Sequence, residues 1–401
     1  MTSTTKGEPA AGGFTGWRGW AAATGHLDAP FAVLDLDAIE ANAADLERRA
    51  GGVPIRLASK SVRVRDLLDR VLARPGWRGV MSYALREALW LAGQDGPSRE
   101  DLFVAYPTAD RGALRALAAD ERALAAITLT VDSVEHVEAL GRWVPRGTPL
   151  RVALDVDASL RVGRAHLGVR RSPTRTPEDA AVVARAAVAA GLAVVGVMYY
   201  DAQVAGLPDS SPAVRLVKRR TDADLRVRRG AVRAAVEDVV GPLTFVDGGG
   251  TGSLEVAGAD PALTELAAGS GLVGPTLFDG YDAFTPRPAL AFALPVVRRP
   301  APDVVTVSSG GYIASGPPGA SRVPSVHAPE GLRLLRAEGA GEVQTPLRGP
   351  GARGLAIGDR VWFRHAKGGE LAERLDRYHL VRGDRLVGEV PTYRGEGRCF
   401  G

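Results

Sequence analysis

The residue in this sequence best suited to covalent chemistry is Lys60, which ends the short run Arg56-Leu57-Ala58-Ser59-Lys60. Lysine occurs only at positions 6, 60, 218 and 367, and arginine supplies the other 46 of the 50 basic residues. A lysine amine that loses its proton attacks a carbonyl carbon, whereas the arginine guanidinium stays protonated at any working pH. Lys60 is therefore a candidate Schiff-base lysine, and a solvated lysine at the end of a strand is the simpler alternative.

Two glycine-rich segments are suited to holding a phosphate group. The first is Asp247-Gly248-Gly249-Gly250-Thr251-Gly252-Ser253, and the second is Ala268-Gly269-Ser270-Gly271. Glycine lets backbone N–H groups crowd around an anion, and the hydroxyl side chains add further donors. One such loop alone is most simply a turn. Two of them, together with a scarce lysine, favour a cofactor that carries both a phosphate and a carbonyl group.

The elements that position these residues alternate between strands and helices. Strands are expected near 54–59, 79–83, 101–106, 127–131, 150–155, 194–200, 243–247 and 265–268. Amphipathic helices are expected over 62–72, 85–92, 111–118, 134–143, 177–190 and 213–240. This alternation predicts parallel strands with right-handed crossovers. Eight strands over roughly 230 residues predict an α/β fold with a closed (β/α)8 TIM barrel, and an open doubly wound sheet is the alternative.

The barrel prediction places the three chemical segments together. Lys60 ends the first strand, and the glycine loops follow the seventh and eighth strands. In such barrels the active site is built at the C-terminal ends of the strands, and phosphate often binds between the last two loops. We therefore expect Lys60 to face the two glycine loops across the mouth of the barrel.

The chain changes character after about residue 285, where proline and glycine become frequent. Short strands without long helices are expected over 292–297, 304–307, 332–335, 359–363, 378–381 and 385–390. This pattern predicts a C-terminal all-β domain. We expect a partly disordered N-terminal segment over 1–29, a barrel over 30–285 and the β domain over 286–401. The strand at 31–36 precedes the barrel repeat and is free to pair with the β domain.

Composition excludes several classes of protein. The net charge of +4 comes from arginine interleaved with 46 acidic residues, which does not indicate a nucleic-acid surface. Cys399 is the only cysteine, so internal disulfides and cysteine metal clusters are excluded. No segment has the apolar length of a signal peptide or a membrane span. These features predict a cytoplasmic protein that binds neither membrane nor nucleic acid.

On these residues the chain resembles the fold-type III enzymes that use pyridoxal 5′-phosphate (PLP). That group includes alanine racemase, D-threonine aldolase and eukaryotic-type D-serine dehydratase. The resemblance covers nearly all of residues 28–401 and is strongest at Ala32–Asp37, Arg56–Lys60, Gly248–Ser253 and Ala268–Phe278. The pieces are most similar to the D-threonine aldolase and D-serine dehydratase branch, especially to bacterial proteins described as amino acid deaminase/aldolase. The resemblance implies that Lys60 holds the PLP aldehyde, and that the phosphate is held by Gly249, Gly250, Thr251, Gly252, Ser270 and Gly271.

Three further residues are implied as contacts of the cofactor. Tyr200 lies in a stretch similar to one that flanks the cofactor in the aldolase branch, and packing under the barrel rim is its alternative role. Relatives also place an arginine near the ring, two residues before a glycine. Arg161 and His166 both have that spacing, before Gly163 and Gly168. The sequence leaves the choice between Arg161 and His166 open, and a surface salt bridge is a further alternative for Arg161.

A possible metal site lies in the C-terminal domain. In the resembling branch, a histidine and a cysteine or aspartate two residues later bind a divalent metal that polarises the substrate's β-hydroxyl. This chain has His365, but Lys367 takes the second position. A charged ammonium cannot be a ligand, so the divalent metal is uncertain. Lys367 could supply the positive charge itself, Glu370 could restore a ligand, or both His365 and Lys367 could be structural.

The segment Ser309–Ser315 loosely resembles the one that carries the second acid/base tyrosine of alanine racemases. Tyr312 is therefore a conditional candidate for that role, and core packing is its alternative. In fold-type III dimers the C-terminal domain of one subunit completes the active site of the other. The resemblance thus implies a homodimer with shared active sites, in which Tyr312 and His365 act in trans.

The resemblance implies a PLP-dependent lyase that acts on a D-configured β-hydroxy amino acid. Retro-aldol cleavage needs a base on the β-hydroxyl, for which His365 is the expected residue. Dehydration needs Lys60 to remove the Cα proton while His365 or Lys367 expels the hydroxyl. The alternatives are an amino acid racemase that uses Lys60 and Tyr312, a PLP-binding protein without turnover, and a phosphosugar barrel enzyme without PLP.

Overall fold

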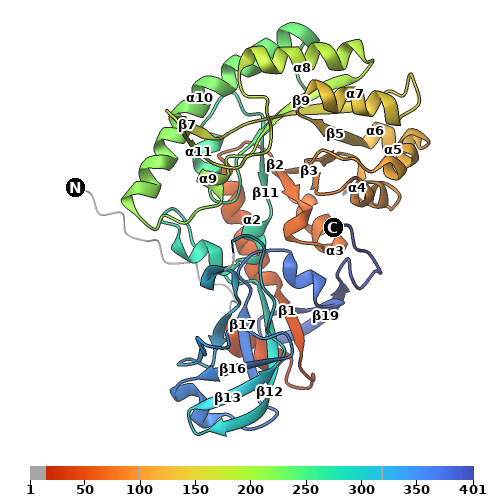
Figure 1. Ribbon diagram of the computed structural model, residues 1–401. Helices are drawn as coiled ribbons and strands as arrows, with labels where there is room; N and C mark the ends of the chain where they lie inside the picture. The colour runs from red at the N-terminus through yellow and green to blue at the C-terminus, as the bar shows by residue number, and fades with distance from the viewer. Residues whose placement is uncertain (1–14, 97–98, 318) are drawn as a thin grey trace.

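Eight parallel strands form a closed barrel in the computed structural model, which describes residues 15–96, 99–317 and 319–401. Residues 1–14 of the N-terminal segment expected over 1–29 lie outside these ranges. The barrel strands follow one another in the order β10, β11, β2, β3, β4, β5, β6, β9 (Figure 1). Their bounds are β2 (Ile55–Ala58), β3 (Trp77–Ser82), β4 (Leu102–Val104), β5 (Ile127–Val131), β6 (Arg151–Val156), β9 (Ala193–Tyr199), β10 (Phe245–Gly248) and β11 (Glu265–Ala268). The predicted TIM barrel is confirmed, and the open sheet is wrong.

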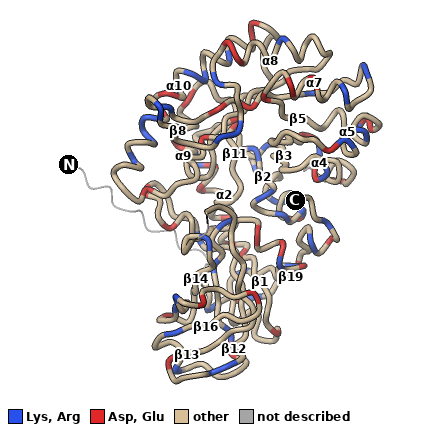
Figure 2. The backbone as a smooth tube through the Cα atoms, viewed as in Figure 1, with Lys and Arg blue, Asp and Glu red and all other residues tan. Residues whose placement is uncertain are grey.

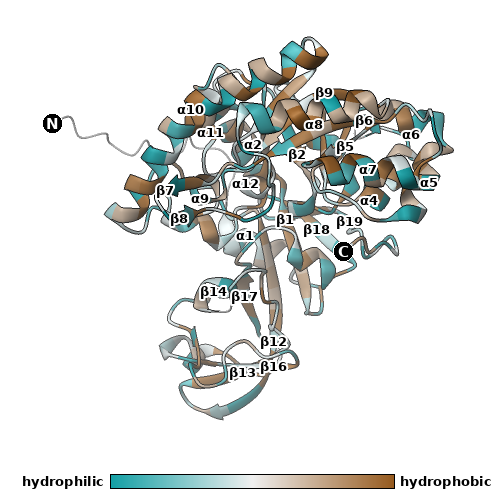
Figure 3. Ribbon diagram, turned by 45° about the horizontal axis from the view of Figure 1, so that its top comes forward, coloured by the Kyte–Doolittle hydropathy of each residue, from teal (hydrophilic) through white to brown (hydrophobic). Residues whose placement is uncertain are grey.

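Amphipathic helices surround the barrel and bury one face each, as the mixture of hydrophobic and hydrophilic residues along them indicates (Figure 3). Many begin at a residue whose side chain accepts a backbone N–H, such as Asp35, Asp110 and Ser133. The longer helices are α2 (Leu36–Ala50), α3 (Arg65–Leu72), α4 (Leu85–Ala92), α5 (Arg111–Ala118), α6 (Glu121–Ala126), α7 (Val134–Trp143), α8 (Pro177–Ala189) and α10 (Pro212–Val240). The short ones are α9 (Ala202–Ala205), α11 (Leu254–Gly258) and α12 (Ser270–Val273).

A second, nine-stranded sheet lies below the barrel in Figure 1. The first half of its long strand β12 (Leu290–Ala301) pairs with β1 on one edge and with β17 on the other, and its second half pairs with β13. β1 (Phe31–Asp35) lies between β12 and β18, so this early strand belongs to the second sheet. The other members are β13 (Val304–Ser308), β14 (Ser325–Ala328), β15 (Arg333–Leu334), β16 (Gln344–Arg348), β17 (Arg360–Arg364), β18 (Arg377–Arg382) and β19 (Arg385–Pro391).

Three structural features were not expected from the sequence. A helix, α1 (Gly16–Ala23), packs its buried Trp20 against Trp362 of the second sheet within the expected N-terminal segment. Strands β14 and β16 are additional members of the second sheet. β7 (Leu160–Val162) and β8 (Ala165–Leu167) form a separate hairpin after β6. Short strands such as these carry too little periodicity to be separated from loops.

Charged residues of both signs are interspersed over the barrel and the second sheet (Figure 2). Within the described ranges, no helix has both the length and the apolar character needed to cross a membrane.

A buried ion cluster fills the barrel at the level of β2. Arg56, fully buried, donates two hydrogen bonds to Glu265 at 2.6 and 2.9 Å. It also donates to both carboxylate oxygens of Asp101, at 2.9 and 3.0 Å. Arg56 lies on β2 and Glu265 on β11, which are the first and the last barrel strands in chain order. The cluster therefore links the two strands whose pairing closes the barrel.

Replacing Arg56 should destabilise the protein strongly. Arg56→Met leaves Glu265 buried without a partner cation, and we expect a loss of about 3–5 kcal/mol in the free energy of unfolding. Urea denaturation followed by circular dichroism measures this loss. The matched control is Arg377→Met, which breaks the exposed pair with Glu389 and should cost less than about 1 kcal/mol. Equal effects of the two substitutions would contradict the assignment.

Candidate active site

A cavity of about 580 Å³ opens at the C-terminal ends of the barrel strands. Its polar and charged lining comes from loops that follow different strands and from the second sheet. These residues are Lys60, Ser61, Arg63, Tyr106, Arg171, Tyr199, Tyr200, Asp247, Thr251, Ser270, Ser315, Lys367 and Glu370. The structure therefore brings together Lys60, both glycine loops, Tyr200 and Lys367, which the sequence analysis selected separately.

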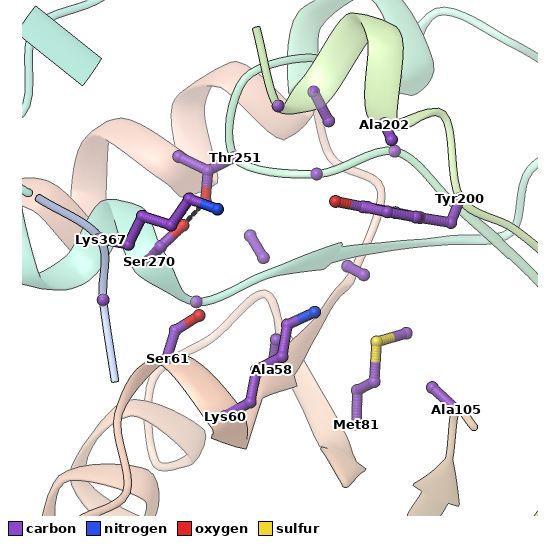
Figure 4. Close-up of a pocket in the computed structure, with 18 of the residues that line it drawn as sticks. Ala58, Lys60, Ser61, Met81, Ala105, Tyr200, Ala202, Thr251, Ser270 and Lys367 are labelled. Atoms are coloured by element: carbon purple, nitrogen blue, oxygen red, sulfur yellow. Dashed lines mark hydrogen bonds between the residues drawn. The ribbon is translucent and has the colours of Figure 1, made fainter. Parts of the chain in front are cut away.

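Lys60 lies in η1 (Ser59–Ser61), the single turn that follows β2. Its Nζ donates a hydrogen bond of 2.6 Å to the hydroxyl oxygen of Tyr106. The same nitrogen lies 5.7 Å from the ring centre of Tyr200. Figure 4 shows the Lys60 amine and the Tyr200 hydroxyl directed into the same space. Lys60 is thus a positioned amine inside a cavity and not a solvated surface lysine.

Tyr106 is a site residue that the sequence analysis missed. It follows β4, at the C-terminal end of the strand expected over 101–106. The signal was available, because every barrel strand ends at the mouth and a tyrosine at that point faces the cavity.

The two glycine loops meet opposite Lys60. The Oγ1 atom of Thr251 accepts a hydrogen bond from the Gly271 N–H at 3.2 Å and lies 3.4 Å from the Ser270 Oγ. A Cβ added at Gly271 would lie 2.7 Å from the Thr251 methyl carbon, and one at Gly250 would lie 2.7 Å from the Ala205 Cβ. Gly249 has φ +74°, which favours glycine. The glycines therefore allow the two loops to pack closely against each other. The loops then present hydroxyl groups and backbone atoms to the cavity.

Gly252 has a packing role in the first glycine loop. A Cβ there would lie 2.4 Å from the Ala205 carbonyl oxygen and 2.5 Å from the Tyr281 ring. Gly252 is not among the residues that line the cavity. Its contribution is to let the loop pass close to α9.

Neither Arg161 nor His166 lines the cavity. The two residues face each other across the β7–β8 hairpin. Arg161 donates a hydrogen bond to Asp157 at 2.9 Å, and the His166 Nε2 lies 3.1 Å from the Val169 carbonyl oxygen. The spacing argument selected these two residues because the sequence did not reveal the hairpin. The hairpin adds residues between β6 and the point where the chain returns to the cavity.

Arg171 is the arginine that the loop after β6 brings into the cavity. Its guanidinium lies 4.8 Å from the ring centre of Tyr200 and 5.8 Å from that of Tyr106. Behind it lies Asp155, whose pKa burial raises to about 7, with the nearby Asp132 carboxylate acting in the same direction and Arg171 opposing. Arg171 therefore places a positive charge between the two tyrosines, next to Lys60.

His365 lies outside the cavity lining, in the chain that follows β17. It is 3% exposed, and its Nδ1 lies 2.5 Å from the Lys367 carbonyl oxygen. Burial lowers its pKa to about 4, so the ring is neutral near pH 7. Its Nε2 atom has no hydrogen-bond partner among the residues that the structure describes. In the part of the chain that the structure describes, no group of three or more His, Cys, Asp or Glu side chains could hold a metal ion.

The loop that carries Lys367 is pressed against the Lys60 turn. Gly369 has φ +101°, and a Cβ there would lie 2.0 Å from the Lys60 carbonyl oxygen. A Cβ at Gly368 would lie 3.0 Å from the Ser61 carbonyl oxygen. Only glycine permits this approach. The loop thus fixes the position of Lys367 relative to Lys60. Burial, together with the charge of Arg322, lowers the pKa of Lys367.

Glu370 completes the side of the cavity formed by the second sheet. Its Oε1 accepts a hydrogen bond from the Ser315 N–H at 2.9 Å, while its Oε2 is buried and has no hydrogen-bond partner among the described residues. The Ser315 N–H therefore fixes the orientation of this carboxylate.

Tyr312 lies away from the cavity lining of its own chain. Its ring packs 5.0 Å from that of Phe292, and its hydroxyl accepts a hydrogen bond from Ser309 at 3.0 Å. The contacts are those of a packed tyrosine at the edge of the core. Its contribution in trans to a second subunit stays a prediction.

Comparison with known proteins assigns this chain to a family. Residues 34–275, which include the whole barrel from α2 to α12, match the family described as alanine racemase, N-terminal domain. The chain belongs to this family. The match includes Lys60 and both glycine loops, whereas Ser315, Lys367 and Glu370 of the cavity lining lie outside it.

Several known proteins resemble this chain over most of its length. A D-threonine aldolase from Arthrobacter sp. is 29% identical over 298 residues, which are 71% of this chain and 72% of the relative. The crystal structure of D-threonine aldolase from Filomicrobium marinum is similar with a TM-score of 0.75 at 22% identity, covering 92% of this chain and 95% of that chain. D-threo-3-hydroxyaspartate dehydratase from Delftia sp. is similar with a TM-score of 0.70 at 21% identity, covering 92% of this chain and 98% of that chain.

The buried histidine gives a pH-dependent stability. His365 has a folded pKa of about 4 against an ordinary value of 6.5, so only the unfolded chain binds its proton between these values. Stability from His365 is therefore present above pH 6.5 and lost as the pH falls, by about 3 kcal/mol in all. Urea unfolding of the wild type and of His365→Gln between pH 7 and pH 4 should show a shallower pH slope in the variant.

His136 serves as the control of opposite sign. A hydrogen bond to Asp132 raises the pKa of His136, so its stabilising effect is present below pH 6.5 and lost as the pH rises. His136→Gln should therefore reduce stability most at low pH. An unchanged pH slope in His365→Gln would contradict the burial argument.

Proposed function

We propose that this protein is a PLP-dependent lyase that acts on D-configured β-hydroxy amino acids. The observation that carries the proposal is the Lys60 amine, held in a cavity opposite the hydroxyl groups of Thr251 and Ser270. An amine on one side suits an aldehyde, and hydroxyl groups with a glycine backbone on the other suit a phosphate. The residues present therefore fit PLP: Lys60 would hold its aldehyde end, and Thr251, Ser270 and the glycine loops its phosphate.

PLP, when bound, supplies a conjugated ring that withdraws electrons from the substrate Cα. The protein's own residues select which bond at Cα breaks. Tyr106 orients the Lys60 amine through the 2.6 Å hydrogen bond. Lys60 is then the group that takes or returns a proton at Cα. Arg171 stacks beside Tyr200 and adds positive charge where negative charge would develop.

Cleavage of the Cα–Cβ bond is the reaction that we put first. It requires a base that takes the proton of the β-hydroxyl oxygen. His365 was the expected base, but its ring lies outside the cavity lining. Glu370 lines the cavity and is oriented by the Ser315 N–H, so we assign the proton acceptor to Glu370. The name of the curated relative, D-threonine aldolase, supports the same reaction.

Lys60 should be required for covalent attachment of PLP. The full chain incubated with PLP should develop the visible absorption band of a cofactor linked to a lysine. Lys60→Ala should lose this band, because Lys367 lies on the Thr251–Ser270 side of the cavity and Lys218 is bound to Asp209 outside it. Lys218→Met, which removes a lysine bound to Asp209 outside the cavity, is the control and should keep the band. A band that survives in Lys60→Ala would refute the proposal.

The reaction is tested by incubating the PLP-loaded protein with D-threonine and D-serine. We expect glycine and an aldehyde from D-threonine, and Glu370→Gln should lower this rate by about 10²-fold or more while keeping the visible band. If a keto acid and ammonia were the only products, the reaction would be dehydration and not cleavage of the Cα–Cβ bond. Formation of the L-enantiomer alone would contradict the lyase assignment and favour a racemase.

A further inference from the structure

We propose that Lys367 binds the phosphate group that Thr251 and Ser270 receive, so that the second sheet supplies the cation of the phosphate seat. The phosphate seat is here the group Gly249, Gly250, Thr251, Ser270 and Lys367. The inference rests on the proposed function, since PLP brings the phosphate. It adds a binding residue from outside the barrel.

The position of Lys367 follows from the close approach of its loop. A Cβ on the neighbouring Gly368 would lie 3.3 Å from the Ser270 Cβ and 3.2 Å from a methyl carbon of Val273. The backbone next to Lys367 is therefore in contact with the start of α12. Figure 4 shows the Lys367 side chain extending from this point to the side of the Thr251–Ser270 pair.

The phosphate seat otherwise offers only neutral donors. Thr251 and Ser270 contribute hydroxyl groups, and Gly249 and Gly250 line the cavity with backbone atoms. Arg49 lies behind the first loop, where its Nε and Nη2 atoms donate to Glu255 and to the Thr251 carbonyl oxygen, and it does not line the cavity. A phosphate dianion bound to neutral donors alone would keep most of its charge uncompensated.

The other cations of the cavity have partners already. Lys60 donates to Tyr106, and Arg63 donates to the Lys60 carbonyl oxygen at 3.0 Å and to Glu373. Arg171 lies over the ring of Tyr200. The Lys367 ammonium, in contrast, forms no hydrogen bond or ion pair with any of the described residues. A half-buried ammonium without a partner is stabilised when an anion joins it.

Two anions would reach this cavity under the proposed function: the phosphate of PLP and the carboxylate of the substrate. Contact between the Lys367 loop and Ser270 favours the phosphate, because Ser270 belongs to the second glycine loop. The charge of the Glu370 carboxylate acts on Lys367, but its Oε1 is bound to the Ser315 N–H and it forms no ion pair with Lys367. The Lys367 ammonium is thus free to form a charge-assisted hydrogen bond with phosphate oxygen.

The experiment compares a cofactor with and without its phosphate. The full chain, purified without added PLP, is titrated with PLP and with pyridoxal while the visible absorption band is followed. Lys367→Met should weaken PLP binding about tenfold or more and change pyridoxal binding less than twofold. Lys367→Arg, which keeps the positive charge, should restore most of the PLP affinity. Arg374→Met removes an exposed positive charge from the same segment and should leave both affinities unchanged.

Each other result overturns the inference in a distinguishable way. Equal weakening of PLP and pyridoxal would mean that Lys367 acts through the fold and not through the phosphate, and urea unfolding of the unloaded variant would reveal it. Unchanged PLP affinity with a raised KM for the D-amino acid would assign Lys367 to the substrate carboxylate. A wild-type protein that gives no band with PLP would refute the proposed function itself, whereas a wild-type band with unchanged Lys367→Met affinity refutes only this inference.

Discussion

The pairing of β2 with β11 is the constraint on which the site depends. Ile55, Arg56 and Leu57 pair with Leu266, Ala267 and Ala268, residues more than two hundred positions away in the sequence. This pairing closes the barrel and brings the turn with Lys60 next to the loop with Ser270. The buried Arg56–Glu265 ion pair joins the same two strands. A change that opens this pairing would separate the amine from the phosphate seat.

The second constraint is the contact between the barrel and the second sheet. Because β1 pairs with both β12 and β18, the chain enters the barrel from the second sheet and returns to it after α12. The loop after β17 then lies against the Lys60 turn, where Gly369 lets the backbones approach. The cavity is therefore a joint product of the two sheets: the barrel supplies Lys60, Thr251 and Ser270, and the second sheet supplies Lys367 and Glu370.

Charge explains how the cavity can receive an anionic cofactor and an anionic substrate. Lys60, Arg63, Arg171 and Lys367 line it, while its carboxylates are Asp247 and Glu370. Burial raises the pKa of Asp247, with the carboxylate of Glu265 acting in the same direction, so its negative charge is disfavoured. The lining thus carries an excess of positive charge, which suits a phosphate and a carboxylate together.

The sequence by itself determined the barrel, because eight apolar strands alternate with amphipathic helices, and it determined Lys60, Tyr200 and the glycine loops, because each directly follows a strand. It could not separate Arg161 and His166 from Arg171, since a two-strand hairpin decides which of them returns to the cavity. It likewise could not tell that His365 is buried away from the cavity while Lys367 enters it. Those outcomes depend on how the loop after β17 packs against Lys60, a contact between distant segments that leaves no periodic pattern in the chain.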